Sequence, residues 1–198
     1  MLPVTGPLFV PFLPTYIPPE LCLTVGIDPA APGAPDVCMD VVRDDVAATG
    51  VSARGLDPEA VAQLEQVVTD AESQGIDLKI VVVDANPPIH APLRDIATEI
   101  GADNPGATVL ALSPSFAGTY SPEYDRVTLE AGEDLAKTGD PVLSSKNFVG
   151  ELTAEHFPWT PFTIVVVLAV ALAVVGTRLL QKWGKRQASA DSAPTSSD

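Results

Sequence analysis

Residues 76–115, IDLKIVVVDANPPIHAPLRDIATEIGADNPGATVLALSPS, decide the fold of this chain. Two short apolar runs, 78–83 and 108–112, are rich in β-branched residues and predict buried strands. Between them Pro92 opens a helical pattern that Gly101 closes. A strand, a helix and a second strand in so short a stretch are typical of a βαβ unit, so we expect two parallel strands covered on both faces.

Further elements extend this unit in both directions. Apolar spacing predicts a helix over 36–49, and a second helix begins at Asp57-Pro58, an N-cap followed by a proline at the first helical position. Alternation in YDRVTLEAG, residues 124–132, predicts a third short strand, and Asp140-Pro141 opens another helix. The expected fold class is therefore α/β, a small βαβ-based sheet flanked by helices.

The C-terminal part contains a long apolar run, PFTIVVVLAVALAVVGTRLL at 161–180, with one charge in twenty positions. At 1.5 Å per residue a helix of this length spans about 30 Å, the thickness of the hydrocarbon core of a bilayer. The alternative, a buried core helix, is seldom apolar all round for so long. We expect one transmembrane helix over 159–183, with an anchor formed by the flanking aromatic and basic residues Trp159, Arg178, Lys182, Trp183, Lys185 and Arg186.

These elements divide the chain into four parts. Residues 1–35 are rich in proline and predict an extended arm, residues 36–156 an α/β domain, and residues 159–183 the membrane helix. Residues 184–198 form a short basic stretch and then a low-complexity, disordered tail. Residues 1–156 carry 24 acidic against seven basic residues, a net charge of −17, which disfavours nucleic acid as a partner.

The sequence gives conflicting indications of sidedness. Basic residues after the apolar run favour a cytoplasmic C-terminus and an extracytoplasmic domain. The N-terminus has no basic region of the kind that starts a signal peptide, and a tail anchor with the domain inside would explain that. Cys22 and Cys38 are the two cysteines; they suit a disulfide in an oxidising compartment or two buried free thiols. We expect a single-pass cell-membrane protein with its domain outside.

Three blocks carry a family resemblance: residues 76–102, residues 107–142 (ATVLALSPSFAGTYSPEYDRVTLEAGEDLAKTGDPV) and FPWT…VVGTRLLQ at 157–181. They resemble a family of actinobacterial single-span membrane proteins of unknown function, found in mycobacteria and corynebacteria, and more distantly the TPM domain. The likeness covers roughly residues 50–183. Members of the family often lie beside genes for peptidoglycan hydrolases, which implies a role in the cell envelope. Some TPM relatives are acid phosphatases or bind calcium, and others are described as assembly factors.

The loop after the first predicted strand holds the candidate metal ligands. Ligands of open α/β sheets gather at the carboxyl ends of strands, and Asp84, Asn86 and Asp95 could offer oxygen atoms to a divalent cation such as calcium. Their spacing matches no known metal motif, so turn-capping and solvated side chains are the favoured explanation of these residues. His90 and His156 are the two histidines; a loop position and a membrane-border position account for them.

No motif identifies a catalytic residue. Ser113 and Ser115 follow the second strand, but no G-x-S-x-G elbow surrounds them and turn chemistry beside Pro114 accounts for both. The acidic segment EAGEDLAKTGD at 130–140 lacks the spacing of an EF-hand loop. The preferred hypothesis is a membrane-tethered, non-catalytic accessory or regulatory module that docks a protein partner of the cell envelope at the bilayer surface. The alternative is a metal-dependent phosphatase or related hydrolase of TPM type that uses Asp84.

Overall fold

The computed structural model describes the backbone of residues 16–154 and 159–191; in the second range the side chains of 159–161, 179 and 182–191 are not described. Two units, Met1–Ala154 and Glu155–Asp198, are each compact by themselves. The first contains six helices and four strands among its described residues, and the second contains the helix α7, Trp159–Asp191. The first half of the predicted arm, residues 155–158 with His156, and the end of the tail lie outside the described residues.

The sheet has the order β1-β2-β3-β4, with bounds Val51–Ser52, Leu78–Val82, Thr108–Leu112 and Ala117–Tyr120. The first three strands are parallel, and β4 is antiparallel to β3. The predicted parallel pair is thus confirmed as β2 and β3, in the register Leu78 to Thr108. The helix between them, α4, covers Ala91–Asp103. It begins one residue before and ends two residues after the predicted helix. The short strands β1 and β4 were not predicted.

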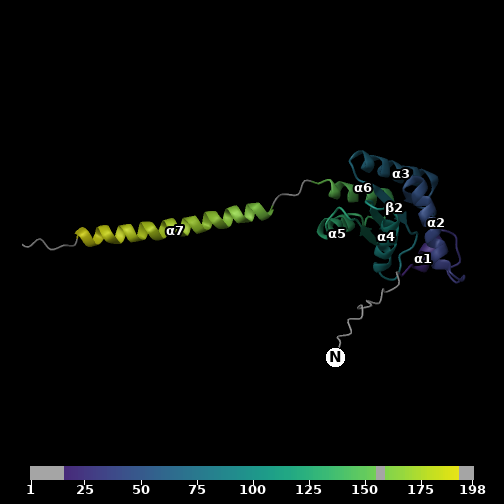
Figure 1. Cartoon of the computed structure of the whole chain (residues 1–198), viewed down its shortest axis with the longest axis horizontal. Helices are drawn as coiled ribbons and strands as arrows, with labels where there is room; N and C mark the ends of the chain where they lie inside the picture. Colours follow the sequence, from purple (N-terminus) through teal and green to yellow (C-terminus); the bar gives the residue numbers. More distant parts are fainter. Residues whose placement is uncertain (1–15, 155–158, 192–198) are drawn as a thin grey trace, which may run out of the picture. The chain divides into compact units, whose positions relative to one another are not determined.

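Helices cover both faces of the sheet. On one face, Leu78 and Ile80 of β2 pack against α3 (Pro58–Ser73), α5 (Arg126–Leu135) and α6 (Pro141–Leu152). On the other face, Val81 and Val83 pack against α1 (Pro19–Thr24), α2 (Ala34–Thr49) and α4. Alternate residues of one strand thus face opposite layers, because side chains point to opposite faces with period two. The α/β fold class is confirmed as a mixed sheet between two helical layers (Figure 1).

Capping explains where the predicted helices begin. The Asp57 carboxylate accepts the N–H groups of Glu59 and Ala60 at the start of α3, and Asp140 accepts those of Val142 and Leu143 at the start of α6. Both caps are followed by proline at the first helical position, as the sequence predicts.

Two predicted elements are wrong. Residues 124–132 were expected to form a strand, but Arg126–Leu135 is the helix α5, started by an Asp125 carboxylate that accepts the N–H of Thr128. The arm was expected to be extended to residue 35, but Pro19–Thr24 forms α1, which packs against α2, and α2 itself begins at Ala34. The physical reason is the same in both places: a proline or an aspartate starts a helix, and this local signal outweighs the alternation of residues 124–132 and the proline-rich composition of the arm.

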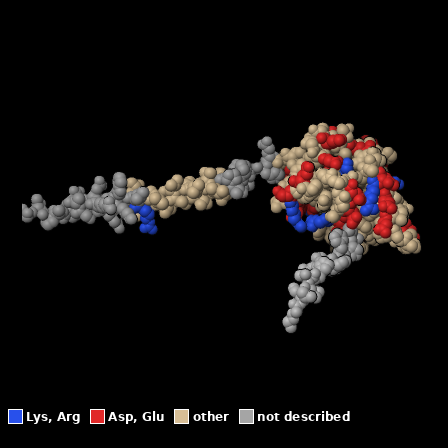
Figure 2. Space-filling view, viewed as in Figure 1, with Lys and Arg blue, Asp and Glu red and all other residues tan. Residues whose placement is uncertain are grey.

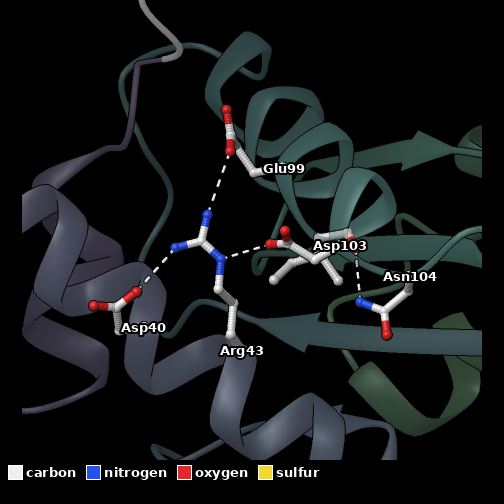
Figure 3. A network of polar contacts seen from close by, with 6 residues as sticks. Asp40, Arg43, Glu99, Asp103 and Asn104 are labelled. Atoms are coloured by element: carbon white, nitrogen blue, oxygen red, sulfur yellow. Dashed lines mark hydrogen bonds and ion pairs between the residues drawn. The ribbon is translucent and has the colours of Figure 1, made fainter.

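An arginine ties α2 to α4 across the second helical layer (Figure 3). From α2, the Arg43 guanidinium reaches Asp103 at 2.6 Å and Glu99 at 3.4 Å, both on α4, and Asp40 on its own helix at 3.1 Å. The hydrogen bond to Asp103 is the largest cause that raises the pKa of Arg43. Elsewhere in the first unit, acidic side chains are spread over the surface that Figure 2 shows, as the negative charge of residues 1–156 predicts.

The helix α7 includes the predicted membrane segment. Its described side chains between 162 and 181 are largely exposed apolar groups such as Val165, Leu168 and Leu172. Within the described residues, no helix combines the length and the apolar composition needed to cross a membrane. Of the predicted anchor residues, Arg178 is described and exposed, and the side chains of Trp159, Lys182, Trp183, Lys185 and Arg186 lie outside the description.

Candidate functional site

A cavity of about 420 Å³ opens where the parallel strands β2 and β3 end. Val82 and Leu112 come from the strand ends, loops supply Leu56 and Pro114, and Pro141 is the first residue of α6. Open α/β sheets bind ligands at this edge, because the loops that leave the strands diverge there and leave a hollow. The position agrees with the edge at which the sequence placed its candidate ligands.

A second hollow of about 640 Å³ adjoins the cavity, with which it shares Leu56, Gly139 and Pro141. It lies between α3 and α6, two helices that run side by side in Figure 1 and pack against each other. Leu143 of α6 lines it and is 48% exposed, so an apolar side chain is accessible in this hollow. We call the two adjoining hollows the strand-end cleft.

Of the residues that the structure describes, Asp84 is the single ionisable one that lines the cavity half of the cleft. Among the described residues, its carboxylate forms no ion pair and accepts no hydrogen bond. The carboxylate lies directly against Gly55, at a spot where any Cβ on residue 55 would overlap it. Glycine at 55 is therefore needed for this position of the Asp84 side chain, a requirement of space rather than of backbone angle.

Asn86 has another role in the same loop. Its Oδ1 accepts hydrogen bonds from the Ser113 hydroxyl at 2.9 Å and from the Ser115 N–H at 2.8 Å, while its Nδ2 donates to the Ser115 hydroxyl at 3.0 Å. Both ends of the amide are thus used to join the loop after β2 to the loop after β3. The same bonds bind the Ser113 hydroxyl to an amide, which is no general base, so the turn interpretation of these serines fits the geometry.

The structure does not bring the three predicted metal ligands to one point. Asp84 faces the cavity, Asn86 joins two loops, and Asp95 on α4 accepts the backbone N–H of Tyr16 at 3.2 Å. Within the described part of the chain, no group of three or more His, Cys, Asp or Glu side chains is arranged to hold a metal ion. A calcium site stays a prediction from the sequence.

The acidic segment near residues 130–140 contributes to a separate groove of about 480 Å³ between α4 and α5. Glu133 is 7% exposed there, accepts the Thr119 hydroxyl at 2.6 Å and lies 3.9 Å from Arg94. Around it Arg126 pairs with Glu130, and Lys137 pairs with Asp134. The segment therefore combines paired surface charges, one buried carboxylate and the Asp140 cap of α6, an arrangement that sequence spacing did not reveal.

The two cysteines lie side by side on α1 and α2. The structure joins Cys22 and Cys38 through an S–S bond of 2.07 Å, with both side chains buried. The bond closes a loop between residues 22 and 38, most of which was predicted to belong to an extended arm.

Sequence reasoning found Asp84 but missed the residues that make the cleft around it. Gly55, Leu56, Gly139 and Leu143 come from loops and helices that lie far apart in the chain. The one signal that could have suggested them is the Gly139-Asp140-Pro141 turn, since a glycine with φ of 84° before a capped helix marks a sharp change of direction.

Comparison with known proteins identifies the chain as a membrane protein of an established family. Residues 16–191 match the family described as membrane protein Rv1476, so the chain belongs to that family. It is 51% identical over 199 residues to membrane protein Rv1476 of Mycobacterium tuberculosis (strain ATCC 25618 / H37Rv), an alignment that covers 98% of this chain and 97% of the relative. The resemblance to an actinobacterial membrane protein family is confirmed. No solved structure gives a significant match, and the TPM-like fold stays a prediction.

Proposed function

We propose that the chain is a single-span membrane protein whose α/β domain docks a protein partner of the cell envelope at the membrane surface. The observation that carries the proposal is the strand-end cleft, a concave surface with apolar groups such as Leu56, Leu112 and Leu143 in its walls. Asp84 is the carboxylate of its cavity half, and Asp57, Asp140 and Lys146 line the other half. Binding sites commonly combine apolar walls with a few polar groups that fix orientation.

The composition of the cleft favours binding over catalysis. General acid–base or nucleophilic chemistry needs at least two groups with matched roles, and among the described residues Asp84 is the single ionisable group that lines the cavity half. In the other half, the Asp57 and Asp140 carboxylates cap α3 and α6. Its unpaired carboxylate is complementary to a cation. The fitting partner is thus an extended polypeptide segment that places apolar side chains against Leu56 and Leu143 and a Lys or Arg side chain against Asp84.

The proposed anchor is the apolar run 161–180 of α7. Support comes from the sequence, which has one charge in twenty positions there, and from membership in a family of membrane proteins. The basic residues that follow the run favour a cytoplasmic C-terminus, and the Cys22–Cys38 bridge suits an oxidising compartment for the domain. We therefore propose that the domain is extracytoplasmic.

Sidedness is tested with two single-cysteine additions to the full chain, Ser73→Cys in the domain and Ser189→Cys near the C-terminus. A membrane-impermeant maleimide should label position 73 in intact cells, and it should label position 189 only after the cells are lysed. The reverse pattern would place the domain in the cytoplasm and overturn the proposed topology.

Docking is tested by photo-crosslinking in cells of the native host. A photoreactive amino acid replaces Leu143 or Pro114, which line the two halves of the cleft, and Val127 as a control, which is 77% exposed and lies outside it. One and the same polypeptide should crosslink from 143 and 114 and not from 127, with a lower yield when Asp84→Ala is added.

Two outcomes contradict the docking proposal. The first is equal crosslinking from all three positions, which indicates nonspecific contact. The second is metal-dependent hydrolysis of a phosphate ester by the purified full chain that Asp84→Ala abolishes, which would establish the hydrolase alternative.

A further inference from the structure

The residues at 16–33, which we call the N-terminal hook, reach the strand-end cleft from the opposite face of the sheet. Leu21 of the hook is 1% exposed and packs in the core layer with Val42, Val81 and Val83. The disulfide between Cys22 and Cys38 fastens the same helix, α1, to α2. The hook is therefore part of the domain, held by burial and by a covalent bond.

One hydrogen bond connects the hook to the cleft. The Asp84 N–H donates to the Thr24 hydroxyl oxygen at 3.0 Å, and the same hydroxyl donates to the Glu20 carbonyl at 2.9 Å. The preceding residue, Val83, donates its N–H to the Leu112 carbonyl at 2.8 Å, so the sheet bonding ends there. Asp84 is thus the first residue beyond the sheet, and its backbone is held by the hook instead of by a neighbouring strand.

We propose that the disulfide-held hook positions Asp84 in the strand-end cleft, with Thr24 as the positioning residue, so that the cleft is complete only in the oxidised chain. Thr24 sits two residues from Cys22 on a helix of six residues. Such a short helix has little stability of its own, and the bridge supplies the constraint that keeps it against α2. This inference rests on the proposed docking role for its biological meaning, but its physical content needs no partner.

The redox chemistry of the bridge is ordinary thiol–disulfide exchange. Formation of the S–S bond removes two electrons and two protons from the Cys22 and Cys38 thiols and passes them to a disulfide oxidant, such as a thiol–disulfide oxidoreductase. Both side chains are buried, at 2% and 0% exposure, so a reductant reaches the sulfurs only when the hook opens. The position of Asp84 in the strand-end cleft would consequently be fixed when the disulfide forms in an oxidising compartment, and it would not change afterwards.

The test is hydrogen exchange, measured by mass spectrometry on the full chain in lipid nanodiscs. Peptides covering 83–88 report on the Asp84 amide, and peptides covering β3 report on the sheet. Thr24→Val should speed exchange in 83–88 by about three- to tenfold, the effect of one lost hydrogen bond, and leave β3 unchanged. Reduction with dithiothreitol, which is oxidised to its cyclic disulfide, should also speed exchange in 83–88. Because reduction lowers the stability of the whole unit, β3 serves as the reference for Thr24→Val alone.

Two controls make the result specific. Thr24→Ser keeps the hydroxyl and should keep the slow exchange, while Thr69→Val removes a hydroxyl that bonds only to the Glu65 carbonyl of its own helix and should change nothing in 83–88. Unchanged exchange in 83–88 after both Thr24→Val and reduction would overturn the inference. Equal acceleration in β3 in the Thr24→Val chain would also overturn it, because the hook would then support the whole domain rather than position Asp84.

The outcome is separable from that of the docking proposal. If Asp84 loses protection as expected but positions 143 and 114 crosslink nothing, the hook positions the loop and the docking role fails. If the crosslinks form equally well in the Thr24→Val chain, docking stands and the positioning role fails.

Discussion

Reduction of the Cys22–Cys38 bridge should lower the free energy of unfolding of the first unit by about 3 kcal/mol. The two cysteines are 16 residues apart. Closing a loop of this length removes roughly 10 cal/mol/K of chain entropy from the unfolded state, which is about 3 kcal/mol at 25 °C. Reduction is a cleaner perturbation than substitution, because it breaks the S–S bond and keeps every buried heavy atom.

The assay is urea unfolding of the full chain in nanodiscs, followed by circular dichroism with and without dithiothreitol. With a slope of about 1–3 kcal/mol/M, the predicted loss moves the midpoint down by about 1–3 M. The Cys22→Ala/Cys38→Ala chain is the control, and dithiothreitol should leave its midpoint unchanged. A midpoint in the wild-type chain that does not move on reduction would refute the reasoning.

Two further predictions concern packing and charge. Gly118→Ala should lower the free energy of unfolding by about 1–3 kcal/mol, because its Cβ would lie 2.5 Å from the backbone nitrogen of Arg94. Gly150→Ala on α6 should raise the free energy of unfolding by about 0.5–1 kcal/mol, because its Cβ would meet nothing within 4 Å; urea unfolding measures both changes. Arg54→Gln should cost about 0.5–1 kcal/mol at pH 7, since the Arg54 guanidinium bonds Asp45 at 2.7 and 2.8 Å and is the largest cause that holds the pKa of Asp45 below 3.8. A depressed carboxyl pKa stabilises the fold above the unfolded value, so the difference between wild type and variant should shrink as the pH falls from about 4 through the folded pKa of Asp45. A difference that does not shrink below about pH 4 would contradict this.

The elements that were predicted correctly are those in which one signal dominates. The strands β2 and β3 are mainly apolar because helices cover both faces, and α3 and α6 begin at an aspartate followed by proline. In each case the local sequence and the environment in the folded domain favour the same secondary structure.

The wrong predictions fall where two signals compete. In residues 124–132, the alternation of polar and apolar residues suggested a strand, but Leu129, Gly132 and Glu133 are the buried positions, at helical spacing. Gly132 also meets Phe148 of α6, where a Cβ would approach the ring to 2.6 Å, a contact with a residue far along the chain that local reasoning does not contain. Competition of this kind is decided by tertiary packing.

The candidate site was predicted as a position but not as a surface. Asp84 follows a predicted strand, and the rule that ligands gather at strand ends placed it correctly at the edge of the sheet. The apolar walls come from four separate segments, and the hydrogen bond from Asp84 to Thr24 joins residues 60 positions apart. No spacing in the sequence connects them.

The most direct test of the central claim, that a partner docks in the strand-end cleft through Asp84, is the yield of crosslinking from position 143 in a Gly55→Ala chain. This substitution keeps Asp84 in the sequence but forces its carboxylate out of its place, because the new Cβ would overlap it. We predict a several-fold lower yield than in the chain with Gly55, with position 127 unaffected. An unchanged yield from position 143 would contradict the claim.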